Sequence, residues 1–215
     1  MKTNENMIKV WDPVVRIGHW TLVMAFLVAY FTEDDYLTLH TWAGYVVGAY
    51  ILCRLLWGFV GTKHARFGDF VPSPFTFTNY IRDLRHKRAK RYLGHNPAGG
   101  AMVLALLISL AATVSSGLML YAIEENKGPL ADWVASTTAT PAIPALIAVA
   151  IADDDSEEEE EDAREEFWEE IHEISTNLTL LLVGLHIAGV LFSSYAHKEN
   201  LIRSMFTGRK PGLEE

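Results

Sequence analysis

The chain has 215 residues, half of them hydrophobic, and a formal net charge of −9 at pH 7. The single cysteine, Cys53, excludes an internal disulfide and any multi-cysteine metal site, and without a Cys-x-x-Cys-His motif a covalently attached c-type haem is excluded too. The basic residues flank apolar segments and form no stripe with interleaved aromatics, so we expect no nucleic-acid binding.

Four apolar stretches, taken in chain order, are long enough to cross a bilayer. A hydrocarbon core of about 30 Å requires roughly 20 mostly apolar residues in a helix. The stretches cover residues 15–31, 39–60, 98–121 and 171–195. Because the polar N-terminus shows no cleavable signal pattern, we expect the first span to be retained. A fifth apolar stretch, 141–152, is shorter and contains two prolines, so we expect a loop segment at the membrane surface or against the bundle.

The charges of the connecting segments predict the orientation of the spans. Residues 61–95 carry eight Lys and Arg, and both terminal segments are also basic. The first connection is acidic, and residues 122–170 hold sixteen Asp and Glu against two Lys and Arg. Since positively charged loops stay on the cytoplasmic side, we expect cytoplasmic termini, a cytoplasmic basic loop and an acidic periplasmic loop over 122–170.

Four histidines lie within these spans at two depths. With the predicted orientation, His19 lies near the cytoplasmic face and His40 near the outer face. His172 and His186 share the fourth span, and their fourteen-residue spacing corresponds to about 21 Å along a helix and within about 40° of the same side. His172 is then level with His40, and His186 is level with His19.

Two pairs of histidines at two depths suit two six-coordinate b-haems. Neutral imidazole is a good iron ligand, and facing helices of a bundle are a common place for such cofactors. Taken singly, each histidine could instead bond a neighbouring helix, and four unrelated core histidines are the alternative. Several glycines lie beside the four histidines and would let a porphyrin approach the backbone: Gly18, Gly44, Gly48, Gly184 and Gly189.

Two motifs carry a family resemblance. The first span opens with Trp-Asp-Pro-Val-Val-Arg-Ile-Gly-His-Trp (11–20), and the second with Leu-His-Thr-Trp-Ala-Gly-Tyr (39–45). With the spacing of His172 and His186, these motifs resemble the bacterial cytochrome b-561 family, which includes the b-type cytochrome subunits of nickel–iron hydrogenases and membrane formate dehydrogenases. The likeness covers most of the chain but not the acidic loop.

The resemblance implies an all-α integral membrane four-helix bundle, a single domain over 1–215 in the bacterial inner membrane. It implies two b-haems, one held by His19 and His186 and the other by His40 and His172. It further implies electron transfer between the quinone pool and a periplasmic partner, either a c-type cytochrome or an oxidoreductase subunit. A homodimer is left open.

Three other residues have two readings each. Arg16 either pairs with a haem propionate or anchors the first span at the cytoplasmic interface. Asn96 and His95 resemble the family's entry to the third span, where a quinone can bind, and Asn before Pro is equally a helix start signal.

Two other segments also leave their roles open. The acidic run 153–162 is either a solvated, disordered block or an electrostatic guide for a basic partner. Residues 73–92 mix apolar and basic side chains and favour a helix at the inner interface.

Two further functions stay open as alternatives to the electron-transfer subunit. A stand-alone superoxide:quinone oxidoreductase would need no acid–base constellation, because oxidation of a small diffusible species at the outer haem requires none. A haem-free membrane anchor would show no b-haem absorbance and would tolerate substitution of the histidines.

Overall fold

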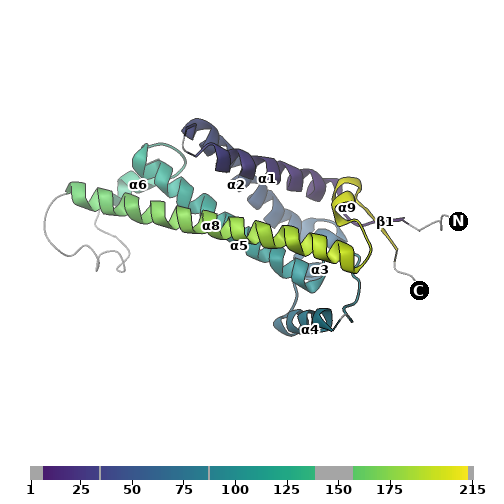
Figure 1. Ribbon diagram of the computed structural model, residues 1–215. Coiled ribbons are helices and arrows are strands. Elements are labelled where there is room, and N and C mark those ends of the chain that lie inside the picture. Colours follow the sequence, from purple (N-terminus) through teal and green to yellow (C-terminus); the bar gives the residue numbers. More distant parts are fainter. Residues whose placement is uncertain (1–6, 34, 87, 139–156, 213–215) are drawn as a thin grey trace. The chain divides into compact units, whose positions relative to one another are not determined.

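The described part of the chain is mostly helical. The computed structural model describes residues 7–33, 35–86, 88–138 and 157–212. In chain order the elements are β1 (Met7–Lys9), α1 (Pro13–Phe31), α2 (Leu37–Val60), the 3-10 helix η1 (Lys63–Ala65), α3 (Phe67–Phe70), α4 (Pro74–Arg85), α5 (Pro97–Glu124), α6 (Ala131–Thr138), α8 (Glu157–Ala196), α9 (Leu201–Thr207) and β2 (Arg209–Pro211) (Figure 1).

Four helices, α1, α2, α5 and α8, are long and apolar enough to cross a membrane, which confirms the four predicted spans. Many of their large apolar side chains lie on the surface: Ile17 is 69% exposed, Leu56 69% and Phe59 74%. Such side chains would be costly in water and are expected where a helix faces lipid. A short helix, α4, lies within the segment predicted to hold an interfacial helix.

The structure corrects the predicted acidic loop over 122–170. Helix α5 continues to Glu124, α6 covers Ala131–Thr138, and α8 begins at Glu157, well before the predicted start of the fourth span. Glutamate is a good helix former, and carboxylates are favourable near a helix N-terminus, so the second half of the acidic run extends the helix. The predicted apolar loop segment 141–152 and the first part of the acidic run lie outside the described residues.

The backbone divides into two units, each described by itself: residues 1–108 with 180–215, and residues 109–179. In the first unit α1 and α2 pack against each other. Asp12 caps the N-terminus of α1, where its side chain accepts a hydrogen bond from the Val15 backbone N–H at 2.9 Å. Its second oxygen accepts from Thr62 Oγ1 at 2.6 Å and from Trp57 Nε1 at 3.2 Å, which joins the start of α1 to the end of α2.

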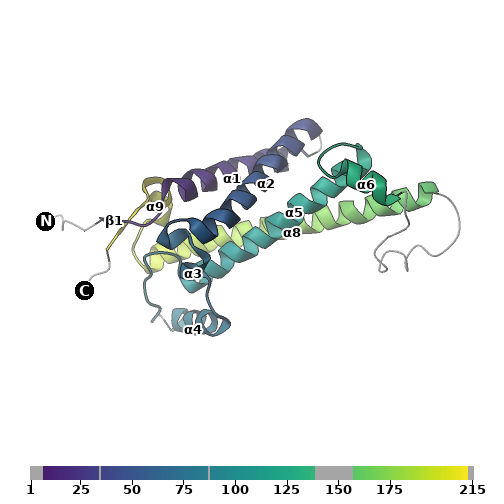
Figure 2. The ribbon, with the colours of Figure 1, turned by 180° about the vertical axis from the view of Figure 1, so that it is seen from behind.

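The C-terminal segment of the first unit returns to the start of α1. Strands β1 and β2 pair antiparallel, with Met7 opposite Pro211 (Figure 1, Figure 2). Between α9 and β2, Gly208 has φ +78, and its carbonyl accepts from the backbone N–H groups of Val10 and Trp11. A side chain at this position would be strained and would collide with the Trp11 carbonyl, so glycine permits the turn.

In the second unit, α5 and α8 meet along small polar side chains. Ser109 and Thr179 join their hydroxyls at 2.6 Å, and Thr179 is fully buried. Ser116 lies 3.5 Å from Ser175 further along the same two helices. Small residues let helix backbones approach closely, and hydroxyls that bond each other avoid the cost of unpaired polar groups in lipid. This seam fixes the part of α8 that carries His172.

Candidate functional site

The structure brings the rings of His19 on α1 and His186 on α8 close together. Their ring centres are 6.5 Å apart and the ring planes are inclined by 50°. The Nδ1 atom of His19 is buried and has no hydrogen-bond partner in the described part of the chain. Gly18 lets α1 approach α2, because a Cβ atom there would lie 2.7 Å from the Tyr50 ring. The predicted proximity of His19 and His186 is therefore present in the first unit.

His40 lies at the start of α2 and is oriented by the end of α1. Its Nδ1 lies 2.9 Å from the backbone carbonyl of Ala29. A carbonyl oxygen only accepts hydrogen bonds, so Nδ1 carries the proton and Nε2 carries the ring's lone pair. An imidazole held in this way has the tautomer and the fixed orientation of a metal ligand.

His172 is held in a similar way within the second unit. Its Nδ1 lies 3.0 Å from the Thr113 carbonyl and 3.1 Å from the Ser116 hydroxyl on α5. The carbonyl again requires the proton on Nδ1 and leaves the lone pair on Nε2. Gly117 makes room for the ring, since a Cβ atom there would approach its Cε1 to 2.9 Å. Because His40 and His172 belong to different units, their pairing stays a prediction.

Arg16 contacts the C-terminal segment of the chain. Its Nε donates to the Met205 carbonyl at 3.4 Å, and a second guanidinium nitrogen donates to the Phe206 carbonyl. These are among the last carbonyls of α9, which have no acceptor role inside the helix, and a cation there also favours the helix dipole. Arg16 therefore caps α9, a role that the sequence did not predict. Its two predicted roles, pairing with a haem propionate and anchoring the first span, stay predictions.

Asn96 and His95 lie where α5 begins. The Asn96 side-chain oxygen accepts from the Gly99 N–H at 2.7 Å, and its amide nitrogen lies 3.5 Å from Ser193 Oγ on α8. The helix start reading of Asn96 is thus present in the structure.

The His95 ring packs against Trp11 and Phe70, with ring centres 4.7 and 4.8 Å away, and its buried Nδ1 has no hydrogen-bond partner. Burial, reinforced by the positive charges of Arg54 and Lys210, lowers the pKa of His95 to about 3, so the ring is neutral at physiological pH.

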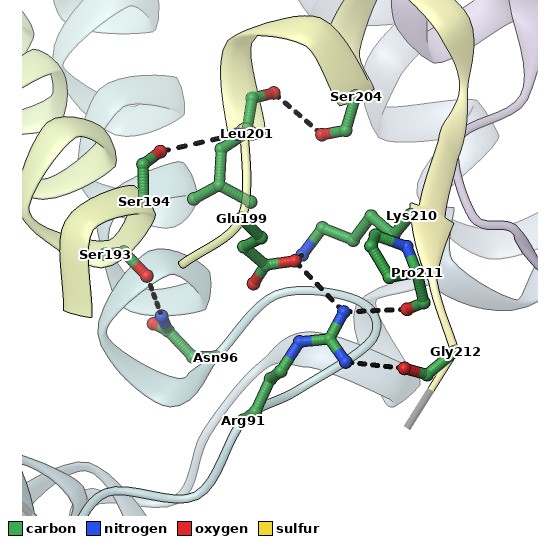
Figure 3. A network of polar contacts seen from close by, with 10 residues as sticks. All are labelled: Arg91, Asn96, Ser193, Ser194, Glu199, Leu201, Ser204, Lys210, Pro211 and Gly212. Carbon is green, nitrogen blue, oxygen red and sulfur yellow. Dashed lines mark hydrogen bonds and ion pairs between the residues drawn. The ribbon is translucent and has the colours of Figure 1, made fainter. Parts of the chain in front are cut away.

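Near Asn96, charged residues connect the segment just after α8 to the C-terminal strand (Figure 3). Arg91 donates to the carbonyls of Pro211 and Gly212, each at 2.7 Å, and contacts Glu199 at 3.3 Å. Lys210 approaches the same Glu199 oxygen at 3.6 Å. The Glu199 and Lys210 side chains are 5% and 4% exposed, so these charges depend on one another.

Arg54, a buried charged residue in the first unit, was not identified as a candidate from the sequence. Arg54 lies within α2 and is only 6% exposed, and its NH1 atom has no hydrogen-bond partner. An arginine inside an apolar span is costly and calls for a functional explanation. That rule alone, applied to the stretch 39–60, would have identified Arg54 from the sequence.

A family model described as prokaryotic cytochrome b561 matches residues 10–208. Among curated proteins, the chain is 28% identical to a probable Ni/Fe-hydrogenase B-type cytochrome subunit of Azotobacter chroococcum mcd 1, over 60% of this chain and 65% of that protein. It is 26% identical to a protein of the same description from Bradyrhizobium diazoefficiens, over 59% and 64% of the two chains. The chain thus spans slightly less than two thirds of the length of these relatives, and no solved structure matches it.

Proposed function

The chain belongs to the prokaryotic cytochrome b561 family, and on this premise we propose that it is a di-haem membrane cytochrome that carries electrons between the quinone pool and a periplasmic redox partner. Membership makes it a multi-pass bacterial membrane protein and a b-type cytochrome. The observation that carries the proposal is the facing pair of His19 and His186.

His19 and His186 form the inner pair, named for their predicted place near the cytoplasmic face. The pair has the separation that two ligands of one iron require. Imidazole nitrogen binds a metal at about 2 Å, so two rings on opposite sides of one ion have centres roughly 6–6.5 Å apart. The ring centres of His19 and His186 are 6.5 Å apart, and Nδ1 of His19 has no hydrogen-bond partner among the described residues. These residues fit a b-haem, which supplies reversible one-electron chemistry when bound.

We assign the second haem to His40 and His172. Each ring is oriented by a backbone carbonyl that fixes the proton on Nδ1, which supports iron ligation through Nε2. The helix spacing of His172 and His186 puts about 21 Å between the two levels. Because haem edges extend toward each other from the irons, direct electron transfer between them is reasonable at this spacing.

The haem assignment is tested by substituting each histidine. A pyridine haemochrome assay should give two b-haems per chain for the unaltered protein. His19→Ala and His186→Ala should remove the same spectral component, and His40→Ala and His172→Ala the other. His86→Ala is the control, because this ring is exposed and, among the described residues, bonds the Arg82 carbonyl of the helix that precedes it. Absence of b-haem, or a different grouping of the four variants, would refute the proposal.

We place the quinone near Asn96 and His95, at the cytoplasmic end of the inner haem. The Asn96 amide nitrogen lies 3.5 Å from Ser193 Oγ, and the side chain also hydrogen-bonds Tyr80; an amide N–H is a suitable donor to a quinone carbonyl. His95 is neutral and offers one ring nitrogen without a partner.

The quinone site is tested with two variants of Asn96. Asn96→Ser keeps an oxygen that can cap α5 but removes the amide donor, whereas Asn96→Leu removes both. Both variants should slow reduction of the inner haem by quinol while keeping the haem content. An unchanged rate in both variants would remove the quinone role of Asn96.

The redox partner is inferred from the relatives. Because they are described as Ni/Fe-hydrogenase B-type cytochrome subunits, we propose that this chain also serves an oxidoreductase, with a periplasmic catalytic subunit or a c-type cytochrome exchanging electrons at the outer haem. Co-purification from native membranes with a redox enzyme would support this assignment, and reduction of quinone by superoxide at full rate with the isolated chain would argue for the stand-alone superoxide:quinone oxidoreductase.

A further inference from the structure

Arg54 carries a buried charge that no carboxylate contacts directly within the described part of the chain. It lies six residues before the end of α2, and its side chain does not reach solvent, since the residue is 6% exposed. A snorkelling arginine would extend its guanidinium to water, so burial of this group argues against an anchoring role. Among the residues that the structure describes, its NH1 atom has no hydrogen-bond partner, which in an apolar span costs free energy unless a ligand supplies one.

The position of Arg54 along α2 matches the level of the inner histidine pair. Arg54 follows His40 by fourteen residues, the same spacing that separates His172 from His186. Fourteen helical residues advance by about 21 Å and return to within about 40° of the same side. Arg54 therefore shares the face of α2 that carries His40 and lies one haem spacing nearer the cytoplasm.

The neighbours of Arg54 belong to the surroundings of His19 and His186. Tyr50, one turn earlier on α2, lies against Gly18, the residue before His19. The guanidinium carbon lies 5.4 Å from the centre of the Phe67 ring and 5.3 Å from that of Phe70. Two aromatic faces hold the guanidinium in place and leave its N–H edge available, because a stacked guanidinium donates in its own plane.

The nearest carboxylate is already engaged elsewhere. Asp12 interacts electrostatically with Arg54, but its oxygens accept from Val15, Trp57 and Thr62. Within the described ranges Arg54 makes no ion pair. Arg16, the other arginine near the inner pair, donates to the carbonyls at the end of α9.

We propose that Arg54 binds a propionate carboxylate of the inner haem through the N–H edge of its guanidinium. This inference rests on the proposed function, in which His19 and His186 hold that haem. Guanidinium and carboxylate match in geometry and charge, and the pair satisfies two buried groups that would each be costly alone. A positive charge beside the haem also disfavours the ferric state, whose charge is higher by one, so Arg54 raises the reduction potential of the inner haem.

The first test compares reduction potentials of the two haems in Arg54→Met and Arg54→Lys. The inner haem, identified as the component lost in His186→Ala, should titrate at lower potential in Arg54→Met and at an intermediate one in Arg54→Lys. The outer haem should not shift in either variant. Arg85→Met is the matched control, because this exposed arginine has the same charge but lies on α4. An inner potential equal to that of the control, or equal shifts of both haems, would overturn the inference.

The second test removes the propionate charge and keeps the arginine. Apo-protein is reconstituted with haem b or with its dimethyl ester, whose carboxylates are blocked. Arg54→Met should weaken binding of haem b at the inner site by at least tenfold and leave binding of the ester unchanged. An equal loss with both haems would show that Arg54 acts on something other than the propionate, for example a quinone oxygen or the stacking of Phe67 and Phe70, and would overturn the inference.

The same data separate this inference from the proposed function. If the unaltered protein takes up no haem at the His19–His186 pair, the proposed function fails. If it takes up two haems and the Arg54 variants leave potential and affinity unchanged, only the role of Arg54 fails. Arg54→Lys keeps the charge, so it provides a folded comparison should Arg54→Met accumulate poorly.

Discussion

Replacing Glu199 by glutamine would test how strongly the C-terminal strand is fastened to the end of α8 (Figure 3). Glutamine keeps the shape of the side chain and removes its charge. Lys210, whose side chain is 4% exposed, would then lose its nearest carboxylate, at 3.6 Å, while Arg91 would keep the carbonyls of Pro211 and Gly212. Removing one partner of a buried pair costs about 3–5 kcal/mol. Because Arg91 keeps other acceptors and its side chain is 21% exposed, we expect the lower end, about 3 kcal/mol.

The assay is thermal unfolding of the purified protein in detergent, followed by tryptophan fluorescence. For a chain of this size 1 kcal/mol corresponds to roughly 2–4 °C, so Tm should fall by about 6–12 °C. Glu125→Gln is the control: the Glu125–Lys127 pair is exposed, with side-chain exposures of 36% and 63%, and its loss should not shift Tm. Adding Lys210→Met to Glu199→Gln should recover part of the loss, since it removes the uncompensated charge. A Tm fall below about 2 °C in Glu199→Gln would refute the reasoning.

Three further predictions follow from single contacts. Asp12→Asn should destabilise the protein by about 1–3 kcal/mol, because one side-chain oxygen becomes an amide that cannot accept from Thr62. Burial alone would raise the pKa of Asp12, but its hydrogen bonds outweigh this effect and keep the pKa below its ordinary 3.8. The contribution of Asp12 to stability is therefore present above that pH and is lost as pH falls through the lower native pKa. Acid unfolding curves should show this loss in the unaltered protein and not in Asp12→Asn. Gly117→Ala should displace His172, which a new Cβ would approach to 2.9 Å, and should lower the content of the outer haem, whereas equal content of both haems would contradict that placement. Neutralising the acidic run 153–162 should slow electron transfer to a basic partner at low salt and have little effect at high salt, and a rate independent of salt in both forms would exclude electrostatic guidance.

The four spans and the family could be read from the sequence alone because both depend on local information. Whether a stretch can form a membrane helix depends on its own length and composition. Helices α1 and α2 begin within two residues of the predicted starts of their spans. The predicted depth of each histidine likewise rests on its place in a helix of known rise, together with the predicted orientation of the spans. The proximity of His19 to His186 was therefore predictable before any tertiary contact was known.

The predicted acidic loop was wrong over its last part, where α8 already begins at Glu157, because the composition of this part is typical of a loop. A block of like charge usually indicates a solvated loop, but glutamate has a high helix propensity, and a helix already nucleated in the membrane extends into such a block at little cost. The sequence reading weighed repulsion and left out this cooperativity.

The amino-acid sequence by itself determined which segments are long and apolar enough to cross the membrane, how far apart His172 and His186 lie along one helix, and the family. Only the tertiary structure decided what surrounds them: that Arg16 caps α9, that Asn96 bonds toward Ser193, that Arg91 reaches Glu199, and that Arg54 lies buried against the rings of Phe67 and Phe70. Helix periodicity and hydropathy are properties of neighbouring residues, whereas these contacts join residues far apart in the chain. Their partners depend on how helices and the C-terminal strand pack, and no local pattern records that packing.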